Sequence, residues 1–109
     1  INSNVSRYYQ MFHPAMLRLL KTTIDAFQAA GKPIGLCGEM GSHRSGSLVL
    51  AGLGLKKISM PGANIGSFKR NLAQVEWKDL QDLGAELLEK DTAEAIQAAV
   101  DSFMKRNAL

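Results

Sequence analysis

The chain has 109 residues, of which 46% are hydrophobic, and it carries a formal net charge of +3. These values predict one domain that spans residues 1–109 and buries its own core. No apolar run approaches the length of a membrane span, and the single cysteine, Cys37, excludes an internal disulfide and favours a reducing compartment. Because the chain begins with Ile1 and shows no charged leader before an apolar run, we expect a piece of a longer protein rather than a secreted precursor.

The charges are unevenly divided along the chain. Residues 1–75 contain nine Lys and Arg against two acidic residues, whereas residues 76–109 contain four against eight. The two parts therefore carry net charges of +7 and −4. The basic residues are scattered and are not interleaved with aromatic ones, so nucleic acid is not an expected partner, although an anionic ligand suits the basic part.

The first predicted regular element is a helix. Residues 1–12 show no hydrophobic period and predict an irregular lead-in. His13-Pro14 then starts a helix, because proline fits the first helical turn. The apolar residues of this helix recur at three- and four-residue steps: Leu17, Leu20, Ile24 and Phe27. Gly31 is placed to end it in a left-handed conformation.

Two short strands are predicted in the middle of the chain. Ile34–Cys37 has the pattern of a buried strand bounded by proline and glycine, and Ile58–Met60 that of a second strand. Between them lie a loop, Gly38–Gly46, and a stretch that is compatible with a compact helix, Ser47–Leu55. A strand-helix-strand unit of this kind pairs its two strands in parallel.

Three helices complete the chain, over residues 64–73, over residues 76–89 and after Asp91, which is placed as a capping residue. Their expected buried residues are Ile65, Phe68, Leu72, Trp77, Leu80, Leu83, Leu87, Ile96, Ala99, Val100, Phe103 and Met104. The order of elements is α-β-α-β-α-α-α, an α/β arrangement. Two strands leave both edges of a sheet unpaired, so we expect the neighbouring strands to lie outside this chain.

The candidate chemistry gathers where the first strand ends. A thiol at Cys37, with a glycine directly after it, is placed to act as a general acid, although a cysteine in a strand is more commonly a small buried apolar residue. Glu39 either binds a ligand hydroxyl or is a solvated loop residue. The Gly41–Ser47 loop resembles an anion-binding loop in composition but lacks the spacing of a P-loop. His13 and His43 have no carboxylate cluster beside them, so no metal site is predicted.

Several motifs, taken together, carry a resemblance to a known family. They are His13-Pro14-Ala15, Gly31-Lys32, Leu36-Cys37-Gly38-Glu39-Met40, Leu53-Gly54-Leu55, Ile58-Ser59-Met60 and Ser102-Phe103-Met104-Lys105-Arg106. This set is similar to the carboxyl-terminal part of Enzyme I, the phosphoenolpyruvate-protein phosphotransferases. More loosely, the chain resembles pyruvate phosphate dikinase and phosphoenolpyruvate synthase. The resemblance covers essentially the whole chain.

The resemblance implies the last quarter of a phosphoenolpyruvate-binding (β/α)8 (TIM) barrel, because 109 residues are far too few for a whole barrel. Strand seven would be Ile34–Cys37 and strand eight Ile58–Met60. The implied function is that of a transferase, which moves phosphate from phosphoenolpyruvate (PEP) to a protein histidine and then to a histidine-phosphocarrier protein. In this reaction Cys37 would protonate the enolate of pyruvate.

The other functional groups that the resemblance implies lie upstream of Ile1. They are the ligands of Mg²⁺, the arginines that bind the substrate and the phosphorylated histidine. The chain alone is therefore expected to be inactive. The longer protein is expected to be a cytoplasmic homodimer with no membrane segment.

The sequence departs from the family pattern beside Cys37. Where the family usually continues with Asp-Pro, this chain has His43-Arg44. Lys56-Lys57 replaces a common acidic pair, as in the nitrogen-branch Enzyme I, and Pro61 replaces a serine. These changes are expected to alter the loop and to affect activity.

Two other function classes remain open on the sequence alone. The first is a non-catalytic module that self-associates through its exposed strand edges, which a concentration-dependent mass would reveal. The second is a thiol redox module based on Cys37, which lacks a resolving cysteine.

Overall fold

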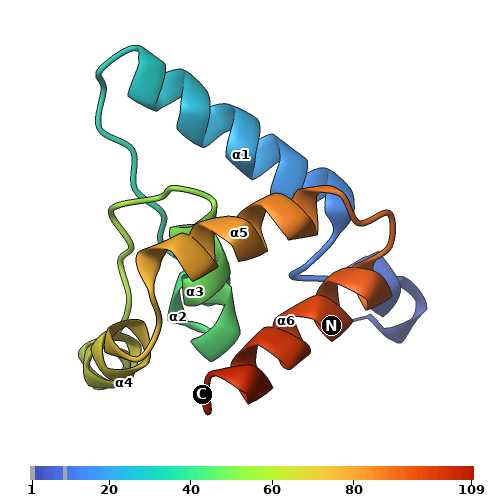
Figure 1. The fold of residues 1–109 in the computed structure, drawn as a ribbon. Helices are drawn as coiled ribbons and strands as arrows, with labels where there is room; N and C mark the ends of the chain where they lie inside the picture. Colours follow the sequence, from blue (N-terminus) through green and yellow to red (C-terminus); the bar gives the residue numbers. More distant parts are fainter. Residues whose placement is uncertain (1, 9) are drawn as a thin grey trace.

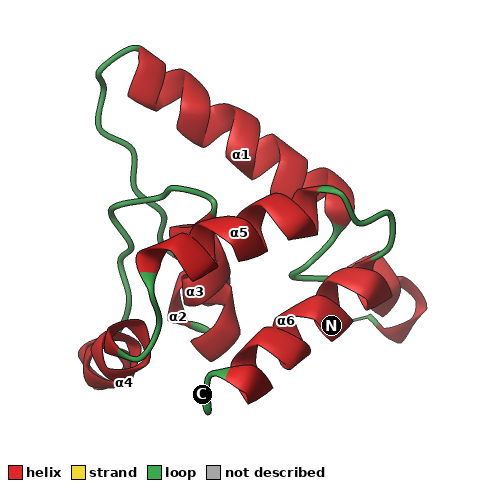
Figure 2. Cartoon of the chain, viewed as in Figure 1, coloured by secondary structure: helices red, strands yellow, loops and turns green. Residues whose placement is uncertain are grey.

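The computed structural model describes residues 2–8 and 10–109, and its regular elements are helices (Figures 1 and 2). In chain order they are the 3₁₀ helix η1 (Ser3–Tyr8) and the α-helices α1 (Pro14–Ala29), α2 (Glu39–Ser42), α3 (Arg44–Gly52), α4 (Gly62–Ala73), α5 (Trp77–Leu88) and α6 (Ala93–Arg106). Within these residues no helix is both long and apolar enough to cross a membrane. The predicted irregular lead-in is partly wrong, because η1 forms there; Ile1 and Tyr9 lie outside the described residues.

Helix α3 is the buried centre of the molecule. Its residues 45–51 are all buried, because every side chain there is small or apolar. A helix without a polar face is stable only when it is covered on all sides. Helices α2, α4, α5 and α6 all contact α3, whereas α1 packs against α5 (Figure 1). The compact helix predicted over Ser47–Leu55 is therefore confirmed, but it begins earlier, inside the predicted Gly38–Gly46 loop, which also contains α2.

Helix α1 forms where the sequence predicts it. His13 is its N-cap, with Pro14 as the first helical residue. At its end Gly31 adopts a φ of +66°, and the Gly31 and Lys32 amides donate to carbonyls of the last turn at 3.0 and 2.9 Å. Leu17 and Ile24 are buried, as the periodicity predicts. Phe27 is an exception: it is the last apolar residue of the stripe and is 40% exposed.

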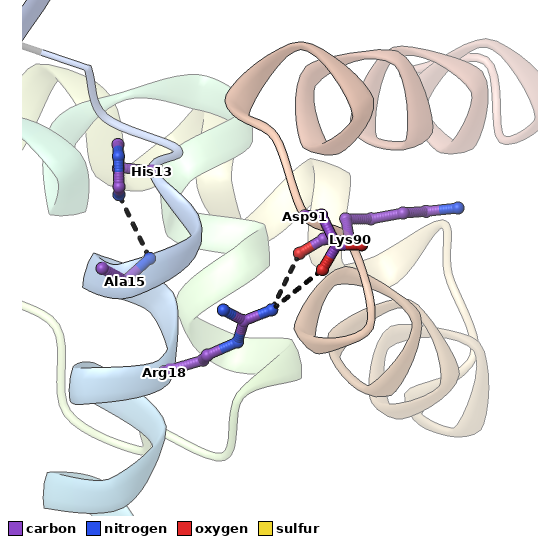
Figure 3. A network of polar contacts seen from close by, with 5 residues as sticks. All are labelled: His13, Ala15, Arg18, Lys90 and Asp91. Carbon is purple, nitrogen blue, oxygen red and sulfur yellow. Dashed lines mark hydrogen bonds and ion pairs between the residues drawn. The ribbon is translucent and has the colours of Figure 1, made fainter.

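Arg18 of α1 connects this helix to the turn between α5 and α6 (Figure 3). Its Nη2 donates to the Lys90 carbonyl at 3.1 Å and lies 3.7 Å from a carboxylate oxygen of Asp91. Both side chains of the ion pair are more than half exposed, so the pair itself contributes little. The contact nevertheless joins segments that are 72 residues apart in the sequence.

The two predicted strands are reduced to a single pair of residues. Leu36 and Ile58 form an isolated parallel bridge, and no longer strand forms in the described part of the chain. The Leu36 amide donates to the Lys57 carbonyl at 3.1 Å, and the Ser59 amide donates to the Leu36 carbonyl at 2.8 Å. The predicted parallel pairing is thus confirmed at one position. The extent of the strands is wrong, since no further strand is present on either side to support them.

The three C-terminal helices are confirmed, with corrections to their faces and caps. Leu80, Leu83 and Leu87 of α5 and Ile96, Val100 and Phe103 of α6 are buried. Trp77 was predicted in the core but is 46% exposed, because this first residue of α5 lines an open groove beside α4 rather than the core. Helix α4 has no buried residue, and Ile65 on its predicted apolar face is exposed. The cap of α6 is Thr92 rather than Asp91, since the Thr92 Oγ1 accepts from the Ala95 amide at 3.1 Å.

Two glycines allow α3 and α5 to cross in close contact. A Cβ added at Gly52 would lie 2.5 Å from the Leu80 carbonyl oxygen, and one added at Gly84 would overlap the carbonyl group of Gly52. The backbones of the two helices therefore touch, with no side chain between them. This crossing fixes the depth at which α3 is buried beneath α5.

Candidate functional site

Cys37 lies directly after the parallel bridge. Leu36 is held by two backbone hydrogen bonds, and the chain turns at Gly38, whose φ of +123° is a conformation that side chains rarely adopt. Gly38 is also the N-cap of α2, so the thiol sits between the bridge and a helix start. Cys37 is exposed. The alternative of a small buried apolar residue is therefore wrong.

The thiol lines a cleft with a volume of about 510 Å³. Glu39, Met40 and His43 contribute from the same stretch as Cys37, and Met11 and Met16 contribute from the start of α1 and the segment before it. The structure thus brings together three residues that the sequence singles out: Cys37, Glu39 and His43. The two methionines were not predicted, since they lie more than twenty residues upstream and carry no motif.

His13 is not part of this cleft. Its Nδ1 accepts a hydrogen bond from the Ala15 amide at 3.1 Å, which caps the start of α1 (Figure 3). In the described part of the chain, no three His, Cys, Asp or Glu side chains are grouped as a metal site would require. The residues described here therefore do not fit a Mg²⁺ site.

His43 links the cysteine segment to the buried helix α3. It is the N-cap of α3, and its Nδ1 accepts from the Gly46 amide at 3.4 Å and lies 3.1 Å from the Ser45 Oγ. This is the role that an aspartate plays at a helix start. The close approach also depends on Gly46, because a Cβ there would overlap the Met40 carbonyl oxygen. The imidazole of His43 thus supplies the acceptor at the start of α3, while the expected effect of His43-Arg44 on activity stays a prediction.

A side-chain hydrogen bond joins the segments that follow the two bridge residues. Asn64, in the first turn of α4, donates its Nδ2 to the Ser42 carbonyl at 2.8 Å. Below it, a Cβ at Gly41 would lie 3.0 Å from the Ile58 Cγ2, so α2 packs directly on the bridge. Asn64 has no motif around it and was not predicted. These contacts hold the Cys37 segment in one position relative to α4.

Replacing His43 tests its role as a cap. We expect His43→Ala to lower the free energy of unfolding by about 1 kcal/mol, because the Gly46 amide loses its acceptor. His43→Asp keeps an acceptor and adds a negative charge at the helix start, so it is expected to be at least as stable as the wild type. Urea unfolding of the two variants is the measurement. Equal stability of wild type and His43→Ala would contradict the cap.

Comparison with known proteins identifies the family to which this chain belongs. Residues 1–77 match the model of a family described as PEP-utilising enzyme, PEP-binding domain. The phosphoenolpyruvate-protein phosphotransferase of Haemophilus influenzae is 34% identical over 108 residues, which is 99% of this chain and 19% of that protein. The protein of the same name from Bacillus subtilis is 31% identical, over 96% of this chain and 18% of its own length.

A further relative carries a different name. Multiphosphoryl transfer protein 2 of Escherichia coli is 39% identical over 82 residues, which cover 75% of this chain and 10% of that protein. The chain therefore spans about a fifth or less of the length of these curated relatives.

Proposed function

Because the chain belongs to the family of the PEP-binding domain of PEP-utilising enzymes, we propose that it is the carboxyl-terminal part of a phosphoenolpyruvate-protein phosphotransferase. The longer protein would transfer phosphate from PEP to one of its histidines and then to a phosphocarrier protein. The observation that carries the proposal is the family match over residues 1–77, which includes Cys37 and its exposed cleft.

In this proposal the parallel bridge is the remaining contact between strands seven and eight of a (β/α)8 barrel. The parallel hydrogen bonds of Leu36 with Lys57 and Ser59, with α3 as the crossover between them, support this reading. Cys37 and the loop after it would then lie at the carboxyl ends of the strands, where barrels of this kind hold their active sites. The first six strands would come from the part of the longer protein that precedes this chain.

We assign Cys37 the role of proton donor. When the phosphoryl group leaves PEP for a histidine, the remaining three-carbon fragment is the enolate of pyruvate. The S–H bond of Cys37 breaks, its proton forms a C–H bond at the methylene carbon, and the enolate becomes the ketone. The resulting thiolate regains a proton from water, which its exposure permits.

Other parts of the proposal concern residues outside this chain. Mg²⁺ would be bound by carboxylates upstream, where it would neutralise charge on the transferred phosphate. The phosphocarrier partner, the homodimer and the cytoplasmic location belong to the longer protein as well. For the isolated chain, in which no further strand of the described residues adjoins the bridge, self-association through its edges is a separate proposal.

The proposed function is tested by phosphorylation of the longer protein. Incubated with PEP and Mg²⁺, it is expected to gain the mass of one phosphoryl group on a histidine. The chain of residues 1–109 alone is expected to gain none, because the acceptor lies elsewhere. Mass spectrometry under alkaline conditions, which preserve phosphohistidine, is the measurement. Phosphotransfer by the isolated chain, or none by the longer protein, would contradict the proposal.

A further inference from the structure

A second cleft, which His43 also lines, lies between α3 and α4, two helices that contact each other. Its volume is about 630 Å³, a size typical of small-molecule sites. Two arginines line it: Arg44 from the start of α3 and Arg70 from the last turn of α4. The other polar lining residues are Ser42, His43, Ser47, Asn64, Ser67 and Asn71. No carboxylate is among the lining residues, so the charge of the cleft is positive.

Neither arginine is neutralised by another part of the described chain. The salt bridges among these residues join other pairs, and none includes Arg44 or Arg70. The Arg70 Nη2 donates to the Ser67 Oγ at 3.1 Å, which orients its guanidinium while leaving other N–H groups free. Two exposed guanidinium groups that line one cleft without an acid provide charged donors that suit an anion.

The position of Arg44 strengthens this interpretation. It is the first residue of α3, and the first turn of that helix contains no acidic residue. A cation at a helix N-terminus is unfavourable, because it faces the positive end of the helix dipole. Stability alone therefore disfavours arginine at this position. Residues that break such a local rule are expected at functional sites.

We propose that this cleft binds a small phosphorylated molecule, with Arg44 and Arg70 as the groups that bind its phosphate. A phosphate monoester carries up to two negative charges and three acceptor oxygens. It therefore matches two guanidinium groups better than a ligand with a single carboxylate group does. The site is distinct from the cleft of Cys37, with which it shares His43. A phosphate bound in this cleft would change the environment of the His43 ring. Because the same ring lines the cysteine cleft, binding in one cleft would affect the other.

The test is a titration of the ¹⁵N-labelled chain with inorganic phosphate, at constant ionic strength maintained with chloride. We expect saturable shifts of the Arg44, Asn64 and Asn71 amides. Arg44→Gln and Arg70→Gln are each expected to weaken binding about tenfold, because each removes a charged, two-pronged donor. Lys69→Gln is the matched control: it removes the charge next to Arg70 but lines a different groove, and is expected to change affinity less than about twofold.

Three results would overturn the proposal. The first is shifts that grow linearly without saturation. The second is an equal loss of affinity in Lys69→Gln, which would indicate general surface charge. The third is saturable shifts centred on Cys37 instead, which would place the phosphate in the other cleft. None of these results bears on histidine phosphorylation of the longer protein, so the two proposals fail independently.

Discussion

If the longer protein is the phosphotransferase proposed above, replacing Cys37 by serine in it is expected to lower the rate of pyruvate formation by about 10²- to 10⁴-fold, the contribution typical of one positioned acid. A hydroxyl is a far weaker acid than a thiol, so the enolate would wait for a proton from solvent. Phosphorylation of the histidine precedes this step and is expected to be retained. When both are measured in parallel, pyruvate release should therefore be slow in this variant while phosphohistidine formation keeps its rate.

The stereochemistry of protonation gives a second readout for Cys37. A positioned thiol adds its proton to one face of the enolate, whereas solvent adds it to both. PEP that carries one deuterium and one tritium in a defined arrangement on its methylene carbon would take up ordinary hydrogen and form a chiral methyl group. The wild type should give one configuration of this methyl group, and Cys37→Ser a mixture of both.

Lys69→Gln serves as the control for this experiment, because Lys69 lines a different groove and the thiol is kept. Thermal unfolding of Cys37→Ser should match the wild type, since the side chain is exposed. Unchanged rate and stereospecificity in Cys37→Ser would remove Cys37 from the reaction.

Replacing Gly84 by alanine is expected to cost about 2 kcal/mol of unfolding free energy. The new methyl group would overlap the Gly52 carbonyl, so α3 and α5 must move apart and open the core around Leu80. The gain in helix propensity, about 1 kcal/mol, opposes this cost and is included in the estimate. For a chain of this length the melting temperature should fall by about 10 °C.

Gly62→Ala is the matched control for the crossing of α3 and α5. Gly62 is also helical, but a Cβ there meets nothing within 4 Å. Its stability is expected to rise slightly, because alanine restricts the unfolded chain. Urea unfolding of both variants measures the difference. If Gly84→Ala is as stable as Gly62→Ala, the helices are not in backbone contact.

Periodicity predicted the helices well and the single-residue details poorly. Leu17, Leu80 and Val100 are buried as expected, because an amphipathic stripe of several turns identifies its own inner face. Trp77 and Phe27 are the outermost apolar residues of such stripes and are partly exposed, and the sequence of one helix does not say how far along it the neighbouring helices pack. The length of the two strands was overestimated. Apolar content predicts a strand, but it does not show whether neighbouring strands are present to pair with it.

The candidate site was predicted where it is local in sequence. Cys37, Glu39 and His43 lie within seven residues, and a turn after a buried segment places them together. Met11 reaches the cleft, and Asn64 reaches the Ser42 carbonyl, only through packing between distant segments, which no local pattern encodes. The capping role of His43 was also missed, since histidine is less common at this position than aspartate or serine.

The Arg18 contact has a consequence for how the chain acquires its structure. The bridge between Leu36 and Ile58 joins residues 22 positions apart, so the loop that it closes around α2 and α3 is short compared with the separation that the Arg18 contact spans. Helix α1 donates to the Leu53 and Gly54 carbonyls through Lys21 and Gln28, but it also packs on α5, and Arg18 reaches a carbonyl 72 residues later. During synthesis the first helix therefore leaves the ribosome long before its partner exists. Docking of α1 is expected to be the late step, and until then its apolar stripe is the surface most in need of a chaperone.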